Sequence, residues 1–178
     1  MSFLIAKDEL TLTDMRNFRA AAEEAGVARA MQKLTRTRDE LLVRSFENIL
    51  DAGAALDQWN TAALAVVGTA YSVFQAVAAF ALANNKVVVF YKVGVETLPF
   101  PVSLLTFRKG GAAGNIKAEF DLEQLVNGNT LEGYFSEPVV YDPTDLIAVQ
   151  VLSRIATGVL ARVQLGAWIV EPVGQRIA

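Results

Sequence analysis

A long span without charge constrains the fold more than any other feature of the sequence. No charged residue occurs between Asp57 and Lys86. The run AALAVVGTAYSVFQAVAAFALA within it is long enough to cross a bilayer as a helix, which needs about 20 apolar residues. However, the run is rich in Ala, contains Thr69, Ser72 and Gln75, and has no basic anchor before it. These features favour strands over a membrane helix or a buried helix.

The strand interpretation places a hairpin across Asn84 and Asn85. One strand is expected from about Tyr71 to Leu82 and its partner from Lys86 to Val95. Asn tolerates the positive φ that a two-residue turn requires. Strands that are apolar on both faces belong inside a sandwich or at a subunit interface. We therefore expect this hairpin to be buried.

From residue 96 onward, short apolar segments alternate with turn residues. The sequence predicts strands at 102–109, 116–122, 134–135, 139–141, 146–153 and 163–170, and a helical turn at 122–126. In the strand at 116–122, Ile116, Ala118, Phe120 and Leu122 are expected to point inward. Gly and Pro/Asp clusters at 110–115 and 142–145 predict turns. This rhythm is typical of an antiparallel sandwich or jelly roll, and not of βαβ units.

The first third of the chain has a helical pattern. Thr13 and Asp14 can cap a first helix that Gly26 would end or bend. Thr37 and Glu40 have the spacing of a capping box, which predicts the start of a second helix. A 4-3-4-3 spacing follows and forms a narrow apolar stripe, made by Leu42, Phe46, Ile49, Gly53 and Leu56. Such a stripe suits packing on the chain's own β body or against a neighbouring subunit.

The sequence therefore predicts a mainly β protein with an N-terminal α-helical arm. The arm is expected at residues 1–58 and an antiparallel, jelly-roll-like β-sandwich at 59–178. The expected interface with another subunit consists of Leu42, Phe46, Ile49, Leu56 and Trp59. Trp168, within a strand pattern, is expected to pack in the core.

Composition removes most catalytic chemistry. The chain has neither Cys nor His, which excludes thiolate nucleophiles, His-based metal centres and Ser-His hydrolysis. Only carboxylate, Lys or Tyr chemistry remains open. The hydrophobic fraction of 53% is more than a small domain needs inside, so part of this surface is expected to meet a partner.

Charged residues give no clear chemical site. Arg29, Lys33, Arg36, Arg38 and Arg44 make the arm locally basic, which indicates a solvated helix face or contact with an acidic protein surface. Nucleic-acid binding is not predicted, because the net charge is −3 and no aromatic residues are interleaved for base stacking.

Three acidic residues, Glu119, Asp121 and Glu123, alternate in the sequence, so the first two share one face of the predicted strand. Paired carboxylates can bind Ca²⁺ or hydrolyse glycosides, but Lys117 shares their face, and we interpret this face as solvated. No catalytic, metal or cofactor site is predicted, and no enzyme.

Four segments resemble virion structural proteins of tailed bacteriophages, in particular small jelly-roll proteins that decorate or cement the capsid or complete the head. They are FPVSLLTFRKGG (100–111), AEFDLEQL (118–125), GYFSEPVVYDPTD (133–145) and VQLGAWIVEPVG (163–174). The resemblance covers about residues 60–174. It implies homo-oligomers, often trimers, bound to the major capsid protein or another virion protein, with no cofactor and no active site.

Other functions stay open on the sequence. A carbohydrate- or receptor-binding sandwich of a tail fibre or adhesin would need exposed aromatics, for which Tyr91, Tyr134 and Tyr141 are the candidates. A membrane anchor would use residues 61–83, and a carboxylate-dependent enzyme is a further alternative. The start, MSFLIAKDELT, lacks the basic region and cleavage site of a signal peptide. We therefore expect synthesis in the cytoplasm, and the resemblance to virion proteins implies incorporation into the virion.

Overall fold

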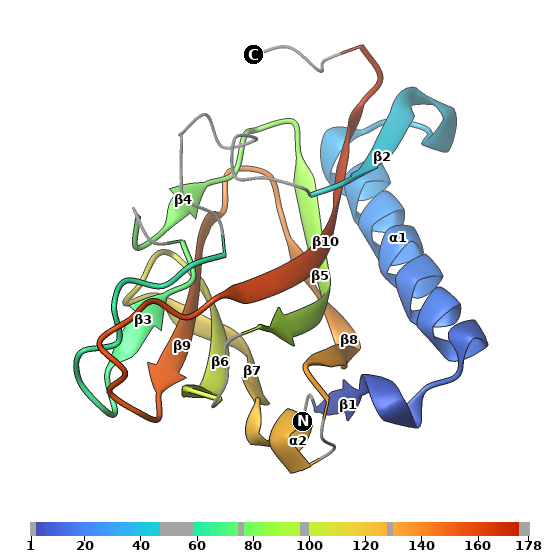
Figure 1. Cartoon of the computed structure of the whole chain (residues 1–178). Helices are drawn as coiled ribbons and strands as arrows, with labels where there is room; N and C mark the ends of the chain where they lie inside the picture. Colours follow the sequence, from blue (N-terminus) through green and yellow to red (C-terminus); the bar gives the residue numbers. More distant parts are fainter. Residues whose placement is uncertain (1–2, 47–58, 75–76, 97–99, 128–129, 175–178) are drawn as a thin grey trace.

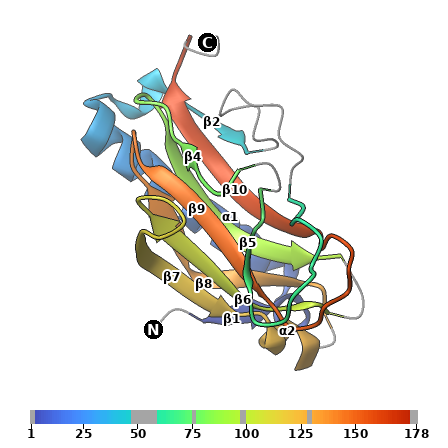
Figure 2. The ribbon, with the colours of Figure 1, turned by 90° about the vertical axis from the view of Figure 1, so that its left-hand side faces the viewer.

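Two antiparallel β-sheets face each other across one apolar core, and a long helix lies on the outside of one sheet (Figures 1 and 2). The computed structural model describes residues 3–46, 59–74, 77–96, 100–127 and 130–174. Its strands are β1 (Leu4–Ala6), β2 (Leu41–Ser45), β3 (Ala70–Ser72), β4 (Phe80–Ala81), β5 (Val87–Val95), β6 (Val102–Lys109), β7 (Asn115–Asp121), β8 (Glu132–Tyr141), β9 (Leu146–Ser153) and β10 (Val163–Pro172). Its helices are α1 (Leu12–Leu34) and α2 (Glu123–Asn127), with short 3₁₀ turns at Lys7–Glu9 and Arg38–Glu40.

The strand order is that of a jelly roll. Sheet A has the order β1-β8-β5-β10-β2, and sheet B has the order β3-β9-β6-β7, with β4 also paired to β9. Apart from β1 and β4, the strands pair in a nested way: β2 with β10, β3 with β9, β5 with β8 and β6 with β7. The first strand thus meets the last and the middle two meet each other, as in a long hairpin rolled into two sheets. The predicted jelly-roll-like sandwich is confirmed.

Helix α1 covers the outer face of sheet A. The Thr11 side chain accepts a hydrogen bond from the Asp14 backbone N–H at 3.1 Å, and the Asp14 carboxylate accepts one from the Thr11 backbone N–H at 2.9 Å, so the helix starts in a capping box. It continues through Gly26, contrary to the prediction that Gly26 would end or bend it. A Cβ on Gly26 would lie 2.8 Å from Val89 Cγ2. The glycine is therefore explained by close approach of the helix to the sheet.

The predicted boundary at residue 58 is wrong, because segments on its N-terminal side complete sheet A. β1 pairs with β8, and β2 pairs with β10 as the first strand of the jelly roll. The capping box of Thr37 and Glu40 does form, but it holds a single 3₁₀ turn that leads into β2. The predicted apolar helix is thus a strand over Leu41–Ser45, and its remainder after Phe46 lies outside the described residues.

The uncharged span forms no helix in its described part. It supplies β3 and β4 and places Leu64, Val73, Phe74, Phe80 and Leu82 in the core. The predicted hairpin is wrong, because β3 and β4 pair with β9 in sheet B whereas β5 belongs to sheet A. The chain crosses between the sheets here, so its apolar side chains are buried between the two layers.

The later elements match the sequence more closely. Strands β6 and β9 have the predicted bounds, and α2 forms where a helical turn was expected. Ile116 is an exception: it is 53% exposed, not inward, because the pairing of β7 with β6 shifts by one residue between Ile116 and Ala118. Of the helices in the described ranges, none has the length and apolar character needed to cross a bilayer.

Candidate functional site

Exposed apolar side chains gather on two neighbouring loops at one end of the sandwich. The loops comprise residues 60–69 and 155–161, and neither contains a charged residue. They lie side by side in both views, in teal and red (Figures 1 and 2). We call their exposed large side chains the loop patch: Val66 (57% exposed), Val67 (58%), Ile155 (38%), Val159 (56%) and Leu160 (43%).

Hydrogen bonds hold the two loops in a defined arrangement. Leu64 N–H donates to Val159 O at 3.0 Å, and Gly158 N–H donates back to Leu64 O at 3.0 Å. The N–H groups of Ala65 and Val66 both donate to the Tyr71 hydroxyl at 3.1 Å. An apolar surface that is already ordered loses little conformational entropy on binding. The loop patch therefore has the character of a preformed contact surface.

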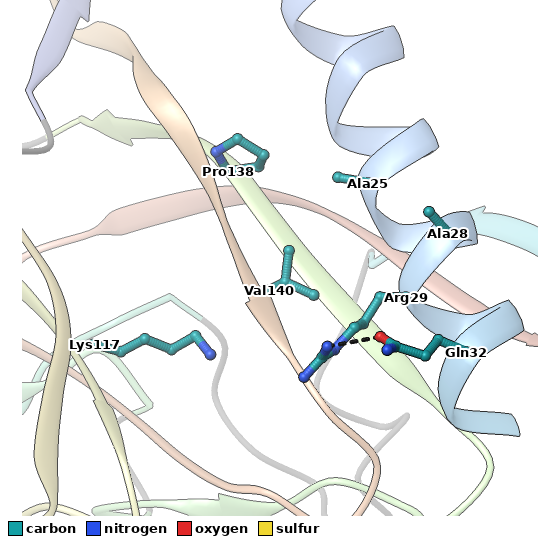
Figure 3. A pocket seen from close by; sticks show the side chains of 7 residues that line it. All are labelled: Ala25, Ala28, Arg29, Gln32, Lys117, Pro138 and Val140. Atoms are coloured by element: carbon teal, nitrogen blue, oxygen red, sulfur yellow. Dashed lines mark hydrogen bonds between the residues drawn. The ribbon is translucent and has the colours of Figure 1, made fainter.

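A second feature is an open pocket between α1 and the sheets, which we call the helix–strand groove (Figure 3). Its volume is about 470 Å³. Ala25, Ala28, Arg29 and Gln32 line it from α1, Pro138 and Val140 from β8, and Lys117 from β7. The lining is thus mixed, with alanine, proline and valine side chains beside the polar Gln32 and a cation on either side.

Charges around the groove are unevenly matched. Asp142 accepts hydrogen bonds from Arg29 Nε at 2.5 Å and Nη2 at 2.7 Å, and Lys33 Nζ lies 3.7 Å from it. The hydrogen bonds from Arg29 hold the pKa of the Asp142 carboxyl below its ordinary value. Asp145 pairs with Lys109 Nζ at 2.7 Å. Lys117 has no carboxylate partner among the described residues, and its Nζ lies 5.0 Å from the centre of the Tyr141 ring.

The residues predicted to form an interface are not brought together on one surface. Leu42 is 38% exposed on the edge strand β2. Phe46 and Trp59 are both buried in the core, with ring centres 5.7 Å apart, so the prediction is wrong for these two. Ile49 and Leu56 lie outside the described residues. The stripe fails because its periodicity assumed a helix, whereas the chain turns inward after β2, where Phe46 N–H donates to Ala167 O.

Most of the expected basic cluster is neutralised within the chain. Arg29 and Lys33 face Asp142, Arg36 lies 3.3 Å from Glu40, and Arg44 Nε lies 2.7 Å from Glu171. Glu171 is only 1% exposed, and it also lies 3.6 Å from Lys86 Nζ. These ion pairs tie α1 and β2 to sheet A, so the basic residues of this segment serve the fold.

The acidic trio also has local roles. Glu119 accepts a hydrogen bond from the Thr106 hydroxyl at 3.2 Å, and Asp121 accepts one from the Glu123 backbone N–H at 2.8 Å. The second bond caps the start of α2. No group of three or more acidic side chains with metal-ligand geometry occurs within the part of the chain that is described.

The tyrosines proposed for carbohydrate binding are buried. Tyr91 and Tyr134 are each 8% exposed beneath α1, and Tyr141 is fully buried between the sheets. Its hydroxyl donates to Arg108 O at 3.0 Å, and burial raises its pKa. The expectation that these three rings line a sugar-binding groove is therefore wrong. Trp168, also 8% exposed, packs under α1 as predicted and donates through Nε1 to Arg19 O at 3.2 Å.

No protein-family model matches the chain, and no curated protein matches it either.

Proposed function

We propose that this chain is a non-enzymatic structural protein of a bacteriophage particle, which decorates or cements the head lattice by self-association. The observation that carries this proposal is the loop patch. Its apolar side chains come from two loops without charge that are hydrogen-bonded to each other. Burial of apolar area favours association at about 25 cal/mol per Å² before the costs of binding.

The position of charges supports a second copy as the occupant of the patch. Arg154 and Arg162 flank the loop at 155–161, and each is paired with a carboxylate, Glu123 at 3.8 Å and Glu96 at 3.3 Å. The patch thus has an apolar centre and a polar, locally neutral rim, which is the anatomy of many protein–protein interfaces. Repetition of one modest contact over a lattice gives avidity without a large single interface.

The jelly roll supports a virion role, because viral capsid proteins use this fold. Lectins and cupins use the same fold, so the fold alone does not decide the function. A carbohydrate-binding role is not proposed, because the aromatic residues that it needs are buried. Genes for a major capsid or portal protein beside the gene of this chain would support the virion role independently.

Self-association can be tested with single charges placed on the patch. We expect the wild type to form a defined oligomer, often a trimer in proteins of this kind, when light scattering is followed across concentrations. Val67→Glu and Val159→Glu should each shift the equilibrium toward monomer, because an ionised side chain would have to lose its hydration on contact. Both positions are exposed, so the free energy of unfolding should change by no more than about 0.5 kcal/mol.

Val173→Glu is the matched control. Val173 is 61% exposed and lies at the end of β10, outside the patch. It should leave the oligomer intact. A wild type that stays monomeric at all concentrations would overturn the proposal, as would equal effects of Val67→Glu and Val173→Glu.

A further inference from the structure

Next to the helix–strand groove, one edge of β8 has no strand partner among the described strands. β1 pairs with β8 only from Gly133 to Phe135, with one further hydrogen bond from Ser136 N–H to Phe3 O. Among the described strands, Val139–Tyr141 pair with β5 alone. A strand with one neighbour has alternate N–H and C=O groups on its other side, which can accept another strand.

A bulge in the facing strand directs Lys117 to this edge. In the ladder between β6 and β7, Phe107 pairs with Ala118 and Arg108 with Ile116, so Lys117 is the extra residue. Bulges turn a side chain away from the regular alternation of a strand. In Figure 3, Lys117 extends from β7 toward the strand that carries Val140, while Arg29 extends from α1 on the opposite side. Lys117 is thereby separated from the face of Glu119 and Asp121 on which the sequence placed it.

The groove as a whole has an excess of positive charge. Three cations, Arg29, Lys33 and Lys109, share two carboxylates, Asp142 and Asp145, and Lys117 is a fourth cation. Burial of part of its side chain lowers the pKa of Lys117, while the carboxylates of Asp145 and Asp142 act from beyond ion-pair distance to raise it. Lys117 is exposed on β7 and forms no ion pair within the described ranges, so its ammonium is accessible to an incoming anion.

We propose that the helix–strand groove binds an extended peptide segment of a partner protein that carries a carboxylate. The segment adds to the free edge of β8 beside Val140, and its Glu or Asp side chain pairs with Lys117. β1 shows that three residues are enough for a strand in this sheet. Apolar side chains next to the carboxylate would contact Ala25, Ala28 and Pro138, which line the same groove.

The lining favours a peptide over a nucleic acid. Single-stranded nucleic acid is usually held by aromatic side chains that stack on the bases. The groove has no aromatic residue in its lining, and its alanine, proline and valine side chains, beside Gln32 and the two cations, suit the mixed side chains of a β-strand. The groove does not share residues with the loop patch, so either surface can fail its test without affecting the other.

The test uses the full chain and three labelled peptides. The first is acetyl-Thr-Val-Glu-Val-Thr-amide, the second has Gln in place of Glu, and the third has N-methyl groups on both Val residues. By fluorescence anisotropy, we expect the Glu peptide to bind at least about tenfold more tightly than the Gln peptide. One charge-assisted hydrogen bond to Lys117 accounts for a difference in affinity of this size. The N-methylated peptide should lose binding, because its blocked N–H groups prevent strand pairing.

Protein variants assign the effect to Lys117. Lys117→Gln should abolish the preference for the Glu peptide. Arg16→Gln is the matched control, because Arg16 is exposed on α1, does not line the groove and carries the same charge. It should leave the preference unchanged. Circular dichroism of each variant checks that the fold is kept.

Several outcomes would overturn the proposal. One is the absence of binding by the Glu peptide at about 1 mM, and another is equal binding of the Glu and Gln peptides. Binding of the N-methylated peptide would refute strand addition, and competition by inorganic phosphate alone would reduce the groove to an anion site. Tighter binding of a single-stranded oligonucleotide that depends on Lys117 would assign the groove to nucleic acid.

Discussion

Sheets A and B have the same antiparallel construction but bury different numbers of faces. In sheet A, β5 is buried along almost its whole length, because the core lies on one side and α1 on the other. In sheet B, β7 is mostly exposed, and Glu119 and Thr106 form a polar contact on its solvent side. A sheet covered on both faces has continuous apolar strands, whereas a sheet with one wet face alternates. Apolar strands therefore do not by themselves indicate a subunit interface.

The largest expected loss of stability follows from removing the helix that covers sheet A. Removal of residues 7–35 deletes α1 but leaves β1, and it exposes the outer side chains of the sheet, Val87, Val89, Tyr91, Tyr134, Trp168 and Val170. Each large side chain loses about 1.5–3 kcal/mol of burial, and the sum is comparable to the stability of a whole domain, about 5–15 kcal/mol. We expect an insoluble or dye-binding product in expression and fluorescence assays. A soluble truncated chain with a cooperative thermal transition would show that the helix is dispensable.

The next largest loss of stability is expected at the edge of sheet A, where β2 pairs with β10. Glu171→Ala removes the buried carboxylate that faces Arg44 and Lys86. Loss of one partner from a buried ion pair costs about 3–5 kcal/mol, and urea denaturation should report this decrease. Glu119→Ala on the solvent side of sheet B should cost less than about 1 kcal/mol. Equal losses for the two variants would contradict the difference between the sheets.

The contact between helix and sheet gives a smaller effect. Gly26→Val places side-chain atoms where a Cβ already lies 2.8 Å from Val89 Cγ2. Overpacking of this kind costs about 1–3 kcal/mol, measurable as a lower melting temperature. Ala20→Val on the exposed side of α1 should cost only about 0.5 kcal/mol through helix propensity. A Gly26→Val protein as stable as Ala20→Val would mean that α1 does not pack this closely.

The smallest effect is a pH dependence at the end of β8. The pKa of Asp142 is lower in the folded chain, because Arg29 donates hydrogen bonds to the carboxylate. The carboxylate therefore stabilises the fold above its unfolded pKa of about 4, and this contribution is lost as pH falls through the folded pKa. Asp142→Asn should lower stability by up to about 1 kcal/mol near neutral pH, with the difference from wild type vanishing at acidic pH. A constant difference at every pH would exclude this ion pair as the cause.

Some of the fold was predictable from the sequence, and some was not. The predicted bounds of β6 and β9 were correct, because the alternation of apolar and polar residues and the turn residues at the strand ends are local sequence signals. The strand β2 was missed, because Leu42 and Phe46 fit a helical stripe and only pairing with β10, far along the chain, makes Leu41–Ser45 a strand. The hairpin at Asn84 and Asn85 was wrong for the same reason, since the choice of sheet depends on distant partners.

The candidate surfaces depended even more on tertiary structure. The loop patch joins residues 60–69 to 155–161 through hydrogen bonds that no local pattern encodes. Lys117 seemed to belong to a regular outer face, and only the bulge opposite Phe107 and Arg108 turns it to the groove. The absence of charged residues in both loops was visible in the sequence. Together with the turn residues, it was the signal that could have indicated the loop patch.

The central claim is that α1 covers its own sheet A and that the loop patch is the surface that meets other copies. Hydrogen–deuterium exchange at dilute and high protein concentration tests this claim most directly. The account predicts added protection at high concentration in residues 60–69 and 155–161, with α1 equally protected in both conditions. Added protection in α1 with none in the two loops would contradict it.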